Sequence, residues 1–220
     1  MKKILNYLFE HKSLSREQAK EVLHNISNNV YSDAEIAAFI TVYLMRSITI
    51  EELQGFRDAL MELCVPVDLH GQDVIDIVGT GGDGKNTFNI STLSCFIVAG
   101  TGTKVAKHGN YGASSISGSS NVMEQLGYTF KKDSDVLNKE LDEAHICFLH
   151  APLFHPALKV VGPIRKNLGV RTFFNMLGPM VNPASPKYQL VGVYNLEMAR
   201  IYNYLLQQGS SAFTIIHSLD

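Results

Sequence analysis

The segment VIDIVGTGGDGKNTFNIST, residues 74–92, constrains this chain most, because it joins a strand pattern to a glycine-rich turn and a helix pattern. Glycines reach positive φ without strain and allow a ligand to approach backbone N–H groups at the positive end of a helix dipole. An anion, phosphate above all, is the ligand that such a loop suits. The segment therefore predicts an α/β layer fold with a phosphate-binding loop after a strand.

This loop comes close to two familiar patterns, the dinucleotide fingerprint G-x-G-x-x-G and the nucleotide loop G-x-x-x-x-G-K-[ST]. The first needs an acidic residue about 20 positions further on to hold a ribose, whereas residues 84–123 contain neither Asp nor Glu. The second needs a hydroxyl where Asn86 stands, and Asp83 would place a carboxylate inside the phosphate cradle. Neither pattern describes this loop.

A second loop of similar composition, KHGNYGASSISGSS at residues 107–120, follows the strand pattern TKVAK and precedes a helix pattern. One glycine-rich loop could equally be a tight turn with no ligand. Two such loops, each at a strand's end and both in a region without acidic residues, are explained poorly by turn geometry. Together they predict a site for a substrate that carries several phosphate groups.

The rest of the chain predicts a small helical domain followed by an α/β domain. Three capping boxes, each a hydroxyl followed three residues later by Glu or Gln, open helices in the first part: Ser15 with Gln18, Ser32 with Glu35, and Thr49 with Glu52. After Pro66, strand patterns (VIDIV, TKVAK, HICFL, YQLVGVY, AFTIIH) alternate with helix patterns. We expect an all-helical domain over residues 1–66 and a larger α/β domain with a central mixed sheet over residues 67–220.

The last strand pattern, AFTIIHSLD, has no helix after it to cover the sheet. We therefore expect the C-terminal part of the α/β domain to be truncated.

Composition excludes several classes of function. The net charge of −2 gives no general attraction to nucleic acid or to anionic lipid, and the 45% hydrophobic content suits a globular core. The N-terminal segment MKKILNYLFE is too short for a signal peptide or a membrane span. Cys64, Cys95 and Cys147 lie far apart, which indicates buried thiols in a reducing compartment. We expect a cytoplasmic protein with no nucleic-acid or membrane partner.

The two loops and a third segment, GPIRKNLGVRTFFNMLGPMVNP at residues 162–183, together resemble the signature segments of the anthranilate phosphoribosyltransferase family. The resemblance implies a transferase that moves the phosphoribosyl group of phosphoribosyl pyrophosphate to the amine of anthranilate and releases pyrophosphate. This reaction is the second step from chorismate to tryptophan. It builds charge on the sugar and on the leaving group, so it needs electrostatics and alignment more than a protein nucleophile. No catalytic residue is nominated.

The resemblance also implies which residues bind. Those for phosphoribosyl pyrophosphate are Gly79, Gly82, Asp83, Thr87, Asn89, Ile90, Ser91, Thr92, Lys107, His108, Gly109, Asn110, Tyr111, Gly112, Ala113, Ser114, Ser115 and Ser119. Those for anthranilate are Gly79, Asn110 and Arg165, whose planar guanidinium suits a benzoate carboxylate. Ser91 would be a ligand of the cofactor Mg²⁺. For His108, a phosphate contact and a loop-shaping hydrogen bond have equal claims.

Departures from the family pattern accompany this resemblance. Tyr111 stands where the family commonly has Arg, and Asn121 where it has Asp. The family's acidic magnesium pair would lie just beyond Asp220, so we expect this polypeptide to lack half its metal site and to be inactive by itself. The helical domain is expected to form a homodimer contact. The alternatives are a pyrimidine nucleoside phosphorylase-like enzyme, which would want a K-H-S-T-G-G loop, and a non-catalytic relative that binds nucleic acid.

Overall fold

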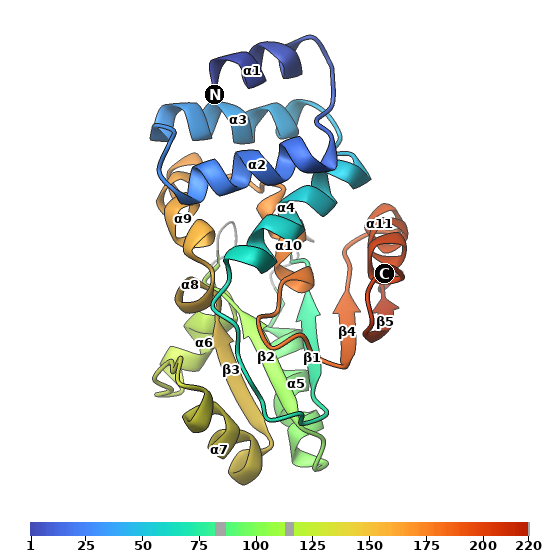
Figure 1. The fold of residues 1–220 in the computed structure, drawn as a ribbon. Helices are drawn as coiled ribbons and strands as arrows, with labels where there is room; N and C mark the ends of the chain where they lie inside the picture. The colour runs from blue at the N-terminus through green and yellow to red at the C-terminus, as the bar shows by residue number, and fades with distance from the viewer. Residues whose placement is uncertain (82–86, 113–116, 220) are drawn as a thin grey trace. The chain divides into compact units, whose positions relative to one another are not determined.

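The chain divides into two units, each assembled from two separate stretches of sequence. The computed structural model describes residues 1–81, 87–112 and 117–219. A helical unit contains Met1–Cys64 and His155–Leu177, and an α/β unit contains Val65–Phe154 and Gly178–Asp220 (Figure 1). The predicted helical and α/β domains are thereby confirmed in type. The boundary at residue 66 stays a prediction, and the sequence patterns did not indicate that residues 155–177 pack with the N-terminal helices.

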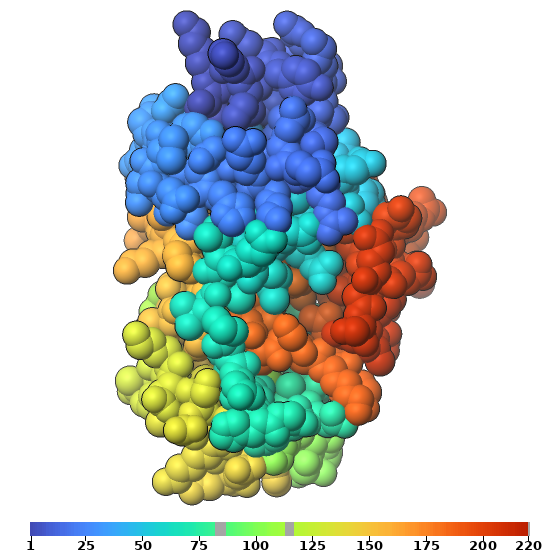
Figure 2. Space-filling model, in the orientation of Figure 1, coloured from blue at the N-terminus to red at the C-terminus, as the bar shows by residue number. Residues whose placement is uncertain are grey.

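The helical unit is built from α1 (Lys2–Phe9), α2 (Arg16–Ser27), α3 (Asp33–Met45), α4 (Ile50–Leu63), α9 (Pro156–Leu168) and α10 (Phe174–Leu177). All three predicted capping boxes are present, at the starts of α2, α3 and α4. Helices α1 to α3, in blue, cover one face of this unit in Figure 2. Each of the three helices therefore begins where its hydroxyl residue satisfies the first free backbone N–H groups.

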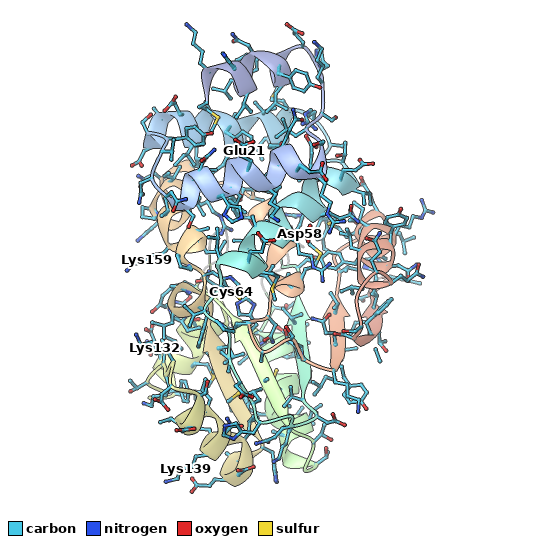
Figure 3. All side chains as sticks on the ribbon, in the orientation of Figure 1. Glu21, Asp58, Cys64, Lys132, Lys139 and Lys159 are labelled. Atoms are coloured by element: carbon cyan, nitrogen blue, oxygen red, sulfur yellow. The ribbon has the colours of Figure 1, made fainter. Side chains whose placement is uncertain are left out.

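Helices α2 and α4 pack at close range. A Cβ added to Gly55 would lie 2.8 Å from the Cβ of Ala19, so only glycine allows this approach. Beside the contact, Arg16 Nη2 lies 2.5 Å from Oδ2 of Asp58, which Figure 3 labels. Packing of the two helical backbones, with the ion pair at its exposed margin, holds α2 and α4 together.

An aromatic cluster forms the centre of the helical unit. The ring of Phe173 stacks on Phe56 at a centroid distance of 4.7 Å and contacts Tyr43 at 4.9 Å. Phe39 meets Phe56 edge to face at 6.0 Å. Large buried rings contribute strongly to a core, with a further 0.5–1.5 kcal/mol, roughly, for each such pair. Phe173 contributes to placing the second stretch in this unit, together with α9, which packs against α2 and α3.

Glu52 is a carboxylate buried in the helical unit, with none of its surface exposed. It accepts hydrogen bonds from the backbone N–H groups of Leu14 and Thr49, from the Tyr43 hydroxyl and from the Arg46 guanidinium, whose Nη1 lies 3.0 Å from Oε2. Burial by itself raises the pKa of the Glu52 carboxyl. The hydrogen bonds from Arg46 and the backbone outweigh burial and hold this pKa below its ordinary value.

We predict that Glu52→Gln lowers the free energy of unfolding by about 3 kcal/mol at neutral pH, because it leaves Arg46 without its partner. The wild type should lose this advantage as the pH falls through the lowered pKa, where the carboxyl of the folded state becomes protonated. Urea unfolding across pH measures both effects. Glu51→Gln, in the same first turn but exposed, is the matched control; equal losses in the two variants would contradict the prediction.

The α/β unit is organised around one parallel sheet. Its strands are β1 (Ile75–Gly79), β2 (Val105–Gly109), β3 (Ile146–His150), β4 (Tyr188–Gly192) and β5 (Ala212–Ile216), in the order β3-β2-β1-β4-β5. The five predicted strands are confirmed. The expected mixed sheet is corrected, since every pairing among the described strands is parallel. Helical crossovers after β1, β2 and β4 return the chain to the same edge and so impose this direction.

Helices cover both faces of the sheet. Val105 and Ala106 are adjacent on β2 and so point to opposite faces. Val105 packs with Cys95 and Ala99 of α5 (Ile90–Gly100), whereas Ala106 belongs to the core that includes Leu137 and Leu141 of α7 (Ser134–Ala144). The remaining elements are α6 (Ser119–Gln125), α8 (Ala151–Phe154), the 3₁₀ helix η1 (Gly178–Met180) and α11 (Leu196–Leu206).

Lys132 and Lys139 of this unit, labelled in Figure 3, are both exposed. Among the described residues, no helix has the length and apolar character that crossing a membrane requires.

Candidate functional site

The carboxyl edge of the parallel sheet brings both glycine-rich loops to one side of the α/β unit. The chain runs from β1 outward through β2 to β3, and then returns to the other side of β1 as β4. Open α/β sheets commonly bind ligands at such a reversal, outside the carboxyl ends of the two strands. Gly79 ends β1 opposite Gly192 of β4, and the Thr80 N–H donates to the Gly192 carbonyl at 2.9 Å. The first loop begins at this reversal.

The described parts of the first loop lead into the N-terminus of α5. Asn89 is its N-cap residue, and its Oδ1 accepts a hydrogen bond from Thr92 Oγ1 at 2.7 Å. Thr87 and Ile90 are exposed and Ser91 is half-buried. The first turn contains no acidic residue, so its backbone N–H groups and the helix dipole present an uncompensated positive end. Gly82 and Asp83, also predicted to bind, lie outside the described residues.

Lys107 and His108, adjacent on β2, are buried on opposite faces of the sheet. Lys107 is 2% exposed, and its Nζ donates to the Ile77 carbonyl at 2.8 Å. His108 is 3% exposed, and its Nδ1 lies 3.1 Å from the Gly178 carbonyl. Both side chains thus contact protein atoms below the strand ends. Their predicted contacts with phosphate stay predictions, and the hydrogen bond of His108 agrees with its loop-shaping alternative.

Asp76 is a buried carboxylate that the sequence analysis did not select. It lies on β1, and its Oδ1 accepts the His108 N–H at 3.2 Å. Burial raises its pKa to about 6, against the opposing effects of the Lys107 charge, Asn182 and the His108 N–H. Asn182 itself donates to the Ala106 carbonyl at 2.9 Å. A single acidic residue inside the apolar strand VIDIV was the available signal, because an isolated buried charge requires internal partners.

We predict that Asp76→Asn changes the pH dependence of stability. A carboxyl whose pKa is higher in the folded state than in the unfolded chain stabilises the fold at low pH, and this contribution is lost as the pH rises through about 6. Between pH 7 and pH 4, the wild type should therefore gain about 2–3 kcal/mol relative to the variant. Asp73→Asn, at an exposed position, is the control. A wild-type advantage that is constant over this range would contradict the prediction.

The second loop leaves β2 at Gly109, where any larger residue would have to displace neighbouring side chains. A Cβ there would lie 2.6 Å from Phe148 Cζ and closer still to Oγ of Ser119, another predicted binding residue. Asn110 follows, and its Oδ1 accepts the Tyr111 N–H at 2.7 Å. The Gly112 N–H donates to Asn121 at 3.1 Å. Ala113, Ser114 and Ser115, also predicted to bind, lie outside the described residues.

The side chain of Tyr111 contacts residues that lie outside the second loop, Glu124 and His150. Its hydroxyl donates to Glu124 Oε1 at 2.6 Å, and its ring meets the His150 ring at a centroid distance of 4.9 Å. His150 in turn stacks on Phe130 at 4.1 Å and contacts Ser120 Oγ through Nδ1 at 2.8 Å. Burial lowers the pKa of His150 to about 4, which leaves it neutral at physiological pH. Tyr111 therefore anchors the loop to a neutral aromatic cluster.

Arg165, predicted to bind anthranilate, belongs to the helical unit, whereas Gly79 and Asn110 belong to the α/β unit. Its Nη2 donates to Asn175 Oδ1 at 3.1 Å, and its Cζ lies 5.5 Å from the centroid of the Phe174 ring. Burial lowers the pKa of Arg165 to about 10. No acidic partner of this guanidinium occurs among the described residues. A desolvated cation of this kind can bind a carboxylate.

The described residues contain no group of three or more His, Cys, Asp or Glu side chains that could hold a metal ion. Ser91 offers one hydroxyl at the start of α5. Mg²⁺ commonly keeps several waters and binds through one or two protein ligands together with substrate phosphates. Ser91 therefore fits as one ligand of an ion that arrives with a phosphorylated substrate, and by itself it does not form a metal site.

Comparison with known proteins places both units in one family of enzymes. A glycosyl transferase family helical bundle domain matches residues 2–64, and a glycosyl transferase family a/b domain matches residues 71–220. The anthranilate phosphoribosyltransferases of Christiangramia forsetii and Flavobacterium psychrophilum are each 64% identical over the whole chain. The chain spans 66% and 67% of the length of these curated relatives, respectively.

Solved structures agree with these relatives. Anthranilate phosphoribosyltransferase from Thermus thermophilus superimposes with a TM-score of 0.82 at 34% identity, covering 98% of this chain and 65% of that one. The enzyme from Saccharomyces cerevisiae, in complex with phosphoribosyl pyrophosphate and magnesium, gives a TM-score of 0.81 at 31% identity. That match covers 92% of this chain and 61% of the yeast chain.

Proposed function

Because the chain belongs to the anthranilate phosphoribosyltransferase family, we propose that it transfers the phosphoribosyl group of phosphoribosyl pyrophosphate to the amine of anthranilate in tryptophan biosynthesis. The observation that carries this proposal is the arrangement of two glycine-rich loops at the carboxyl ends of β1 and β2, beside the reversal in strand order. Residues 84–123, which include most of both loops, contain no acidic side chain. The similarity to the yeast enzyme, whose structure holds phosphoribosyl pyrophosphate, supports the same substrate.

The loop residues would bind and orient the phosphate groups. The first turn of α5 offers backbone N–H groups and the hydroxyls of Ser91 and Thr92 to an anion. In the second loop, Asn110 and Ser119 supply polar groups beside the end of β2. These groups would stabilise negative charge as it develops on the departing pyrophosphate. The chain would contribute alignment and electrostatics, while the nucleophile would be the amine of the second substrate.

Magnesium is the proposed cofactor, supported by the yeast complex. When bound, it would neutralise part of the negative charge of the pyrophosphate group. Ser91 would be its ligand from the described residues, with phosphate oxygens and waters as the others. We propose Arg165 as the group that binds the carboxylate of anthranilate, because this guanidinium lies in a desolvated position with an amide and an aromatic ring beside it.

The proposed activity is tested by the loss of anthranilate fluorescence in the presence of phosphoribosyl pyrophosphate and Mg²⁺, using the protein at its native length. Consumption of anthranilate should require both additions and should release one pyrophosphate for each anthranilate. Pyrophosphate release without loss of anthranilate, or phosphorolysis of pyrimidine nucleosides, would contradict the proposal.

We predict that Arg165→Ala raises the KM for anthranilate by roughly 10-fold to 100-fold with little change in kcat. The charge-assisted bond is made equally in the ground and transition states, and its loss costs about 1.5–3 kcal/mol. Lys166→Ala, an exposed change on the same helix, is the control. An unchanged KM for anthranilate in the Arg165 variant would remove this residue from the site.

A homodimer through the helical domain is proposed as the assembly. Exposed apolar side chains on α1 and α3 support it: Phe9 is 61%, Leu44 is 45% and Met45 is 85% exposed. Burial of such a surface between two copies would favour association. We predict that Met45→Glu weakens the dimer, measured by analytical ultracentrifugation, without lowering the unfolding midpoint of the monomer. A monomeric wild-type protein at micromolar concentration would contradict this assembly.

We also propose that the enzyme works in the cytoplasm, because its free cysteines suit a reducing compartment. Fractionation of cells would test this location.

A further inference from the structure

The described ends of the second loop are joined by one side chain, that of Asn121 on α6. Its Oδ1 accepts the Gly112 N–H at 3.1 Å and the Gly118 N–H at 2.9 Å. Both partners are donors, so the accepting atom has to be the amide oxygen. The two bonds link the limb that leaves β2 to the limb that enters α6. We call these described limbs, residues 110–112 and 117–121, the neck of the second loop.

The backbones of the two limbs are also in direct contact. A Cβ on Gly118 would lie 2.5 Å from the carbonyl carbon of Tyr111, and closer still to Asn110 O and Gly112 N, so the contact requires glycine. The Ser120 N–H donates to the Asn110 carbonyl at 3.1 Å. Asn121 therefore completes a contact that begins with the backbone.

The charge of the side chain at this position matters as much as its shape. A carboxylate could accept the same two hydrogen bonds, but it would add a negative charge beside a proposed phosphate site. Residues 84–123 contain no acidic side chain, and Glu124 is the first one after them. The Tyr111 hydroxyl donates to Glu124 Oε1 at 2.6 Å. Asn121 thus closes the neck with a neutral acceptor within a stretch of chain that has no negative charge.

We propose that Asn121 is a positioning residue for pyrophosphate recognition: it holds the neck of the second loop closed, so that Asn110 and Ser119 are already arranged when the ligand arrives. The proposal rests on the function proposed above and extends it to a residue that does not itself contact the substrate. A segment that is held in place before binding, as the neck is here, loses less conformational entropy when the ligand binds. Closing the neck should therefore strengthen the binding of pyrophosphate specifically.

The test compares Asn121→Leu, which keeps the approximate size and removes the acceptor, with Asn121→Asp, which keeps an oxygen acceptor and adds a charge. Calorimetry with inorganic pyrophosphate and Mg²⁺, using the protein at its native length, measures binding without turnover. Asn121→Leu should bind pyrophosphate about tenfold more weakly, as expected for the loss of two neutral hydrogen bonds. Asn121→Asp should recover most of the affinity in high salt and less in low salt, because salt screens the added charge.

Steady-state kinetics separate positioning from a general defect. In Asn121→Leu, the KM for phosphoribosyl pyrophosphate should rise while the KM for anthranilate stays unchanged. Wild-type pyrophosphate affinity in this variant, or equal losses for both substrates, would overturn the proposal. If Asn121→Leu does not fold, Asn121→Asp still decides, because a large loss of pyrophosphate affinity in high salt would overturn it. A wild-type protein that binds neither pyrophosphate nor phosphoribosyl pyrophosphate would overturn the proposed function and this inference with it.

Discussion

Parallel pairing on both sides of β1 determines where the loops of the α/β unit lie. Because β2 and β4 both run in the direction of β1, every strand that precedes a loop ends at the same edge of the sheet. The two glycine-rich loops are brought together by this geometry, although 20 or more residues separate them in the chain. Gly79 and Gly192 end neighbouring strands in register, which keeps the edge free of side chains at the reversal. The site is thus a consequence of strand order before it is a consequence of any one side chain.

Buried polar side chains form hydrogen bonds with the backbone of β1 and β2, the strands that lead to this edge. Asp76 holds the backbone of His108, Lys107 holds the carbonyl of Ile77, and Asn182 holds the carbonyl of Ala106. Each bond links the backbone of one strand to a side chain of a neighbouring strand or segment. Burying these groups costs free energy unless they have partners. The raised pKa of Asp76, which burial causes, reflects part of that cost.

Local signals predicted well the parts of the fold that depend on neighbouring residues. Capping boxes located the starts of α2, α3 and α4, and runs of apolar residues located the strands. Tertiary relationships were beyond these signals. Nothing local in residues 155–177 shows that Phe173 stacks on Phe56. The expectation of a mixed sheet was wrong, and the alternation of strand and helix patterns in the sequence already favours the parallel pairing that the described strands show.

In the candidate site, too, the sequence predicted some residues and missed others. Motifs selected the glycine loops and Arg165, because the roles predicted for those residues depend on residue type and on position in a pattern. They missed Asp76, whose role depends on a backbone N–H 32 residues away. They treated Asn121 only as a departure from a family pattern, whereas its oxygen connects both limbs of a loop. A residue whose partner is the backbone of a distant segment can be identified only from the three-dimensional structure, which brings the two together.

Arg165 and Lys107, one in each unit, are cations that the fold largely removes from water. Arg165 in the helical unit is desolvated and has an amide and a ring as neighbours, and Lys107 in the α/β unit is buried against a carbonyl oxygen. Removing a charge from water without a full counter-charge is unfavourable, and the penalty falls when an anion binds. Arg165 has no acidic partner among the described residues, so an acidic residue placed beside it would remove that penalty in the free protein, and with it much of the attraction for an anion. Lys107 differs, because its charge already acts on the buried carboxyl of Asp76. We infer that the lack of Asp and Glu over residues 84–123, and the neutral amide of Asn121 at the neck of the second loop, keep negative charge away from the proposed phosphate site.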